Sequence, residues 1–262
     1  MLRIFSRFRK ALMEQNKVRT YTLYAVGEVA LVMIGILLAL QVNNWNEERL
    51  DRIKEQEILH DLKVEFEANL VDLQRTLNEH RIVYAELKEL QQISLSGNFD
   101  NPALDSLTFG FIRWFTFTDR PGASSNLINS GNLNLISNKE LRDLITQWPG
   151  IAADVKDDEV FMVDYIREIL MPLLAELYPL SNVEQVNDRW IRSFEGYRLD
   201  LYETVKPLEQ VNWNRLLDNN TFQSHLALRK LLQTHSMIEG EKAERACLEI
   251  LRLINEELGL LL

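Results

Sequence analysis

The sequence is poor in the residues that build disulfide-linked or repetitive folds. Its 262 residues include one cysteine, Cys247, which excludes a disulfide within the chain and a zinc site made of several cysteines. Ten glycines and six prolines are too few for a collagen-like chain or a Gly/Pro-rich disordered chain. No convincing alternation of apolar and polar residues predicts a β-strand. Because apolar residues make up 46% of the chain, we expect an all-α protein with a real core.

The common catalytic and phosphate-binding motifs are also missing. The chain has no G-x-S-x-G, no P-loop and no G-x-G-x-x-G. Glu57 and His60 match the Glu-x-x-His element of di-iron bundles, but that site needs two such motifs and two further glutamates. We interpret this pair as part of a solvated helix face, and Cys247 as a small buried hydrophobic residue. We therefore expect no metal, no cofactor and no enzymatic activity.

Charge is distributed unevenly along the chain. The net charge of −10 at pH 7 argues against a general nucleic-acid-binding protein. Residues 1–20 nevertheless carry six basic side chains and one acid, so the rest of the chain has a net charge of about −15. Residues 2–13 either form a basic amphipathic helix on the inner leaflet or act only by setting topology. The six basic residues are Arg3, Arg7, Arg9, Lys10, Lys17 and Arg19.

A long apolar segment follows this basic region of residues 1–19. Residues 20–42 contain a single charge, Glu28, and a membrane-spanning helix needs about 20 predominantly apolar residues. We therefore predict a transmembrane helix, with the lipid bilayer as its partner. The segment is longer than the apolar part of a usual signal peptide and lacks an A-x-A exit, which favours an uncleaved anchor. Since acids dominate residues 43–62, the positive-inside rule places the N-terminus in the cytoplasm.

One face of the predicted transmembrane helix carries Tyr24, Glu28, Gly35 and Ala39. Gly35 and Ala39 form a small-xxx-small pair that lets a second helix approach closely. A carboxyl group at membrane depth is costly and normally faces protein or water. We expect this face to contact another copy of the chain or another membrane protein. A hydrated Glu28 near the interface and a proton-carrying Glu28 are the alternatives.

Residues 43–96 predict an amphipathic stalk helix, and residues 97–262 predict an elongated helical bundle. The stalk has apolar residues at helical spacing: Leu59, Leu62, Phe66, Leu70, Leu73, Leu77, Tyr84 and Leu87. The last helix, at about 221–258, is long enough to pack antiparallel on the stalk, and a second copy is the alternative partner. Its expected apolar seam consists of Leu228, Leu231, Leu232, Ile238, Cys247, Leu251, Ile254, Leu258 and Leu261.

Turn and cap residues divide the helical bundle. A helix should start near Pro102 and end before the break at 120–122, and Gly131 suits a left-handed helix cap. Ser137 and Glu140 fit a capping box that begins a helix ending near Trp148. A further helix at about 151–177, with Val163, Ile166, Leu170, Leu173 and Leu177 inward, should be kinked at Pro172.

Two local clusters have competing interpretations. We interpret a run of asparagines as turn and cap chemistry rather than a ligand site; it comprises Asn126, Asn129, Asn132, Asn134 and Asn138. We interpret a run of aromatic residues as core packing, with a binding groove as the alternative; it comprises Phe109, Phe111, Trp114, Phe115 and Phe117.

The membrane segment carries a recognisable motif. It begins Y-A-V-G-E at residues 24–28 and ends A-L-Q-V-N-N-W-N-E at residues 39–47, an exit that includes Asn43, Asn44 and Trp45. This pattern resembles a family of uncharacterised single-pass membrane proteins of Bacteroidota, with valine rather than isoleucine at position 26. The stretch S-G-N-L-N-L-I at 130–136 is similar to another feature of that family. The resemblance implies an inner-membrane location with the helical part in the periplasm, and it implies no activity.

These observations favour a membrane-anchored periplasmic assembly, sensor or scaffold protein without catalytic activity. A periplasmic enzyme, or an accessory subunit of an inner-membrane transport complex, is the alternative. A proton-coupled motor subunit is a third hypothesis, and it rests on Glu28 alone.

Overall fold

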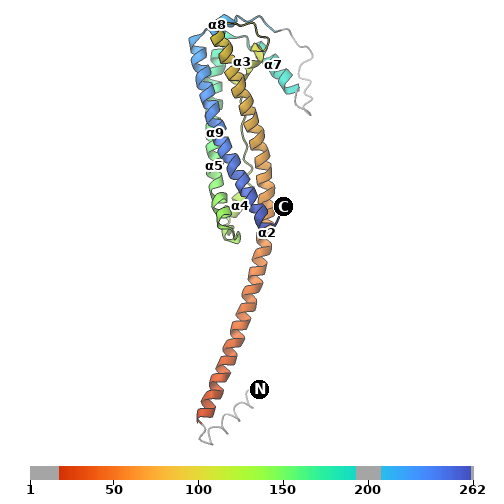
Figure 1. Ribbon diagram of the computed structural model, residues 1–262, viewed down its shortest axis with the longest axis vertical. Coiled ribbons are helices and arrows are strands. Elements are labelled where there is room, and N and C mark those ends of the chain that lie inside the picture. Colours follow the sequence, from red (N-terminus) through yellow and green to blue (C-terminus); the bar gives the residue numbers. More distant parts are fainter. Residues whose placement is uncertain (1–17, 193–207, 261–262) are drawn as a thin grey trace. The chain divides into compact units, whose positions relative to one another are not determined.

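The computed structural model describes residues 18–192 and 208–260, and these residues form helices and turns without a strand. The all-α prediction is therefore confirmed for this part of the chain. The chain divides into two compact units, residues 1–57 and 58–262, which we describe separately. Helix α2 (Val18–Ser96) is continuous in sequence through both (Figure 1).

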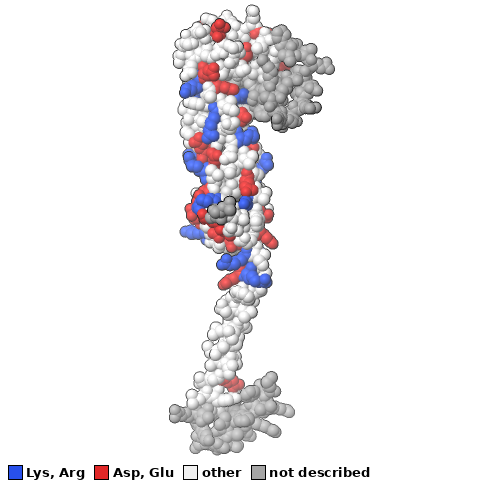
Figure 2. Space-filling model, turned by 45° about the vertical axis from the view of Figure 1, so that its right-hand side comes forward, with Lys and Arg blue, Asp and Glu red and all other residues white. Residues whose placement is uncertain are grey.

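The first unit contains the apolar segment. Helix α2 is long and apolar enough to cross a membrane, and none of its most apolar window is buried in the protein. Large apolar side chains on it, such as Leu31 and Val32, are exposed. The apolar part of α2 has almost no coloured atoms in Figure 2, whereas charges of both signs are intermixed on the visible face of the second unit. A single-pass membrane segment fits this surface.

The second unit is built on three long helices: residues 58–96 of α2, α5 (Lys139–Tyr165) and α9 (Asn220–Glu257). Figure 1 shows α5 and α9 beside this part of α2. The shorter elements are α3 (Leu104–Ile112), α4 (Ala123–Asn129), the 3₁₀-helix η1 (Asn132–Leu135), the π-helix η2 (Ile166–Leu170), α6 (Met171–Leu177), α7 (Leu180–Arg192) and α8 (Trp213–Leu217).

Helix α9 runs antiparallel to α2. The Cys247 thiol donates to the carbonyl of Phe66 at 3.2 Å, near the start of the α2 segment. The side chain of Arg81 pairs with Glu241 at 3.0 Å, and Lys230 donates to Gln91 at 2.6 Å near the end of that segment. The expected stalk seam faces inward, because six of its eight residues are buried and Leu70 and Tyr84 are half-buried.

Asparagine side chains begin α5 and α9. The side-chain oxygen Oδ1 of Asn138 accepts from the backbone N–H of Leu141. Likewise, Oδ1 of Asn219 accepts from the backbone N–H of Phe222. Each satisfies one of the N–H groups that a helix start leaves without a partner. The capping box expected at Ser137 is therefore wrong by one residue, because Asn138 has the extended backbone of an N-cap. Gly131 is left-handed, at φ 73°, as predicted.

Helix α5 does not end near Trp148, so that prediction is wrong. It continues through Pro149 to Tyr165. Proline removes one helical hydrogen bond, but the Pro149 ring lies on the exposed side. The buried side continues across it with Trp148, Ala152 and Val155. Packing of this continuous apolar face outweighs the local cost of the proline.

The chain after α5 also differs from the expected single helix kinked at Pro172. The π-helix η2 ends at Leu170, two residues before Pro172, and the N–H of Met171, the first residue of α6, bonds back to the carbonyl of Ile166. A π-turn adds one residue to the helical repeat. Leu174 is therefore fully buried, whereas Leu173, which we expected to be inward, is half-buried. Pro172 then occupies the first turn of α6, where a missing N–H is tolerated.

The expected seam of α9 is wrong over its first half. Leu228, Leu231 and Ile238 are exposed, at 40%, 53% and 46%. Cys247, Leu251 and Ile254 are buried as expected, Leu232 and Leu258 are half-buried, and Leu261 lies outside the described residues. The buried face of the first half instead includes Arg229, Gln233, Ser236 and Gly240. The core of the second unit is therefore interrupted by polar side chains.

Candidate functional site

A polar layer separates two apolar clusters in the second unit. The first cluster includes α2 residues 59–73, the first half of α5 and the last part of α9, and the second includes α2 residues 83–90, α3 and the first turns of α9. The layer comes from all three long helices, and each member is at most 2% exposed. It consists of Thr76 and His80 of α2, Glu159 of α5, and Arg229, Gln233 and Ser236 of α9.

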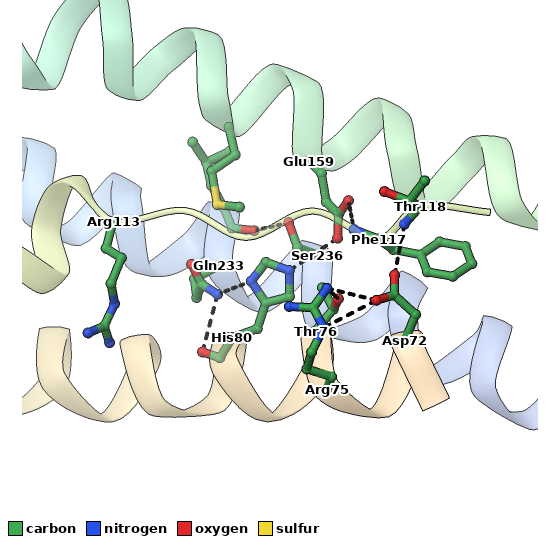
Figure 3. Close-up of polar contacts among 12 residues, drawn as sticks. Asp72, Arg75, Thr76, His80, Arg113, Phe117, Thr118, Glu159, Gln233 and Ser236 are labelled. Atoms are coloured by element: carbon green, nitrogen blue, oxygen red, sulfur yellow. Dashed lines mark hydrogen bonds and ion pairs between the residues drawn. The ribbon is translucent and has the colours of Figure 1, made fainter. Parts of the chain in front are cut away.

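Four of these side chains form one chain of hydrogen bonds, most of which Figure 3 draws. His80 Nε2 lies 3.2 Å from Glu159 Oε1, and His80 Nδ1 lies 2.5 Å from Gln233 Nε2. Gln233 Oε1 accepts from Arg229 Nη1 at 2.5 Å. The chain therefore links a carboxylate on α5 to a guanidinium on α9 through the imidazole of α2.

The chemistry of Arg229 fixes the proton positions along this chain. A guanidinium only donates, so the Gln233 oxygen faces Arg229 and the Gln233 NH₂ faces His80. His80 Nδ1 must then accept, which leaves the proton on Nε2 to be donated to Glu159. The two ring nitrogens of His80 therefore have defined roles: Nδ1 accepts from Gln233 and Nε2 donates to Glu159.

Arg229 is the most unusual member, because its side chain is fully buried. Its other bonds run to the carbonyl of Arg113 at 2.8 Å and to the Met162 sulfur at 2.9 Å, while Nε has no partner in the described part of the chain. Burial and the nearby charge of Arg113 lower the pKa of Arg229 to about 9. The group still carries its charge at neutral pH, and Glu159 is the carboxylate to which the hydrogen-bond chain connects it.

The polar layer also holds the segment between α3 and α4. Glu159 Oε2 accepts from the backbone N–H of Phe117 at 2.8 Å. On the other side of the segment, Asp72 accepts from Thr118 N–H at 3.1 Å, as Figure 3 shows. Asn69 accepts from Arg120 N–H at 3.1 Å. The segment is neither helix nor strand, so its backbone N–H groups have no partners in a regular element. These side chains supply the missing hydrogen-bond acceptors.

Glu65 completes this attachment one turn earlier on α2. It accepts from the backbone N–H of Gly122 at 2.8 Å and of Ser124 at 3.2 Å, and it also bonds the Ser124 hydroxyl. Asp119 points back into the same region, where it accepts from Trp148 Nε1 at 3.1 Å. Burial raises the pKa of Asp119, and the charge of Glu65 adds to this rise.

The aromatic cluster is mainly packing, as expected. Phe109, Phe111 and Phe117 are buried, and the Phe111 ring lies 4.8 Å from that of Phe222 on α9. Arg113 lies over the Phe109 ring at 5.5 Å and forms a 2.7 Å ion pair with Glu86. Burial raises the pKa of Glu86, and Arg113 opposes this rise.

The described residues contain no group of three or more His, Cys, Asp or Glu side chains placed to hold a metal ion. Glu57 and His60 are exposed. A hollow of about 490 Å³ lies between residues 116–121 and α5, and Glu159 lines it. Both oxygens of the Glu159 carboxylate already accept hydrogen bonds, from His80 and from Phe117 N–H, so this side chain has a structural role at the hollow.

The residues selected from the sequence lie elsewhere. Tyr24, Glu28, Gly35 and Ala39 are exposed on α2 in the first unit. The exit residues are also on α2, where Asn43 donates to Glu47 at 2.8 Å, Asn44 is exposed and Trp45 is 67% exposed. Arg3, Arg7, Arg9, Lys10 and Lys17 lie outside the described residues, and Arg19 is in the first turn of α2.

Sequence reasoning missed the polar layer. Its signal is a gap in the apolar pattern of α9, where Arg229, Gln233 and Ser236 replace apolar residues between Leu226 and Ala243. His80 and Glu159 occupy inward positions on α2 and α5 at the same level.

The comparison with known families gives one match. Residues 28–149 match a family of unknown function, DUF6090. The match covers the second part of the apolar segment, the stalk, α3, α4 and the start of α5, a little under half of the chain. The match therefore includes Glu65, Asn69 and Asp72, but not Glu159, Arg229 or Gln233. No curated protein and no solved structure matches the chain.

Proposed function

We propose that the protein is a non-catalytic, membrane-anchored assembly, sensor or scaffold protein of the inner membrane, with its helical unit in the periplasm. The observation that carries this proposal is the apolar segment of α2, which is long enough to cross a membrane and is not buried in the protein. The basic residues before the segment and the acids after it support a cytoplasmic N-terminus. The buried side chains from Glu159 through His80 and Gln233 to Arg229 bond one another, which favours a structural role for them.

The proposed assembly surface is the face with Tyr24, Glu28, Gly35 and Ala39. A side chain added at Gly35 would meet no atom of this chain within 4 Å, so the glycine is not needed for packing within the protein. A small residue on a membrane helix instead lets another helix approach. The partner is another copy of the chain or another membrane protein.

Cysteine labelling in spheroplasts tests the topology. In a Cys247→Ser background, Lys10→Cys reports on the N-terminus and Asn78→Cys, at an exposed position of the second unit, reports on the helical unit. A membrane-impermeant maleimide should label position 78 in intact spheroplasts and position 10 only after lysis. The reverse pattern, or extraction of the protein by alkaline carbonate, would contradict the proposal.

Native mass spectrometry of the full-length protein tests assembly. We expect a defined oligomer that Glu28→Gln and Gly35→Leu weaken, while Met33→Leu on the opposite face leaves it intact. A monomer in all samples would refute the assembly face. A stoichiometric second protein would support the alternative of an accessory subunit, for which Glu28 in the apolar segment is the favouring observation.

A further inference from the structure

The asparagine run at residues 126–134 does not form the turn and cap contacts that the sequence suggests. Asn138 caps α5, but the side chains of Asn126, Asn129, Asn132 and Asn134 make no hydrogen bond to any described residue. Three of them instead line one hollow. The turn and cap interpretation is therefore wrong for these four residues, and their amide groups are available to a ligand.

The hollow has a volume of about 550 Å³ and lies between α2 and the α4–η1 region. Asn126 and Asn129 are on α4, and Asn132 begins η1 after the left-handed turn at Gly131. From α2, Asp61 and Ile58 complete the wall, and Leu127 is part of the lining. The volume is within the range of small-molecule sites.

The lining groups define the chemistry of a ligand. Each carboxamide offers two donors and an accepting oxygen, so a pair of neighbouring hydroxyl groups can both donate to it and accept from it. Asp61 accepts only, and it has no hydrogen-bond partner among the described residues. Ile58 and Leu127 add apolar surface, which suits the C–H faces of a sugar ring.

Other ligand classes fit less well. The lining contains no Lys or Arg, and its one charged side chain is Asp61, so phosphates and acidic ligands would be repelled. It also contains no aromatic ring on which a nucleobase could stack. The three amides and the carboxylate in the wall disfavour a lipid chain, which would leave them without hydrogen-bond partners.

We propose that this hollow, which we call the asparagine hollow, binds a neutral glycan. The proposal rests on the proposed function in one respect, since a periplasmic location would expose the hollow to cell-envelope glycans. The hollow is open and its amides are exposed, so we expect weak binding, with a millimolar dissociation constant.

Saturation-transfer NMR on the full chain in nanodiscs tests the proposal. The probes are N,N′-diacetylchitobiose and cellobiose, which are uncharged disaccharides. We expect saturable binding of at least one probe, and a loss of about tenfold in affinity in Asn126→Ala/Asn129→Ala, because two amide partners are removed. Asn134→Ala is the matched control, since Asn134 is exposed and without a hydrogen bond but lies outside the lining. Its affinity should stay within about twofold of wild type.

Two results would overturn the proposal: no saturation by either disaccharide up to about 50 mM, well above a millimolar dissociation constant, or equal binding by the double alanine variant. Co-sedimentation with insoluble cell-wall glycan separates the two sources of such a ligand. Retention that the disaccharide competes away indicates the polymer, and binding of the disaccharide without retention indicates a free sugar. These assays use purified protein, so their failure would leave the membrane-anchored role and its labelling test unaffected.

Discussion

Replacing Gln233 with leucine tests the polar layer at its centre. The amide of Gln233 accepts from Arg229 and donates both to His80 Nδ1, at 2.5 Å, and to the His80 carbonyl, at 3.2 Å. Leucine has a similar volume and removes all three bonds. A polar group left buried without its partner costs about 1–3 kcal/mol. In this variant the Arg229 guanidinium and the His80 imidazole each lose a hydrogen-bond partner.

The expected net effect is a destabilisation of about 2–4 kcal/mol, because the added apolar surface of leucine returns about 1 kcal/mol. For a unit of this size, that lowers the melting temperature by about 5–15 °C. Circular dichroism of the full chain in detergent measures the shift. Gln74→Leu is the matched control, since Gln74 is an exposed amide on α2, and its effect should stay within about 0.5 kcal/mol.

A double-mutant cycle separates lost contacts from a general loss of packing. Arg229→Met removes the buried charge that Gln233 satisfies, so the double variant Arg229→Met/Gln233→Leu should lose less stability than the two single variants together. Additive losses, or a Gln233→Leu protein as stable as wild type, would refute the hydrogen-bond chain.

Three further predictions concern single positions. Gly240→Ala should lower the melting temperature, because the new Cβ would lie 2.7 Å from Leu77 Cδ2. A Cβ at Gly150 would have no atom within 4 Å, so Gly150→Ala should raise stability by about 0.5–1 kcal/mol. Comparable shifts in both variants would contradict this packing. Burial raises the pKa of Cys247 to about 12, so iodoacetamide at pH 8 should modify it only after unfolding, and rapid alkylation of the folded protein would contradict its burial. The pKa of Asp119 is raised in the folded state, so its contribution to stability is present at low pH and is lost as pH rises through that pKa. Urea titrations between pH 4 and 7 should show a flatter pH dependence of the unfolding free energy in Asp119→Asn than in wild type. An unchanged pH dependence would argue against the raised pKa.

The sequence was sufficient to predict the helices but not every face that they bury. Residues 43–96 contain no helix breaker, and the α2 seam from Leu59 to Leu87 follows one apolar stripe, so periodicity identified its inward side correctly. Helix α9 has an apolar stripe through Leu231 and Ile238 and a polar stripe through Arg229 and Gln233. Periodicity favours burying the apolar stripe, and it is wrong here because the partners that satisfy the polar stripe are His80 and Glu159, 153 and 74 positions away from Gln233 along the chain.

The errors around the prolines have a related cause. Pro149 carries a local signal that ends helices, yet the residues on either side of it, Trp148 and Ala152, pack into the first apolar cluster. The Trp148 ring lies 5.1 Å from that of Phe66, and its N–H reaches Asp119. The rule that proline ends helices considers only residues that are neighbours in the sequence, so it does not include these contacts.

The apolar clusters alone do not fix the register of the three long helices against one another, whereas the polar layer can. Leucine-rich seams can slide past one another by a turn, about 5.4 Å, with modest changes in buried apolar area. The hydrogen-bond chain permits no such slip, because His80 must be level with both Gln233 and Glu159. A shift of α2 by one turn would break the bonds of His80 to Gln233 and Glu159, so a buried imidazole, amide and carboxylate would each lose a partner, which costs more than the apolar contacts could recover. We therefore infer that the polar layer sets the register of α2 against α5 and α9, and with it the position of the segment at residues 113–122 that Glu159 and Asp72 hold on either side.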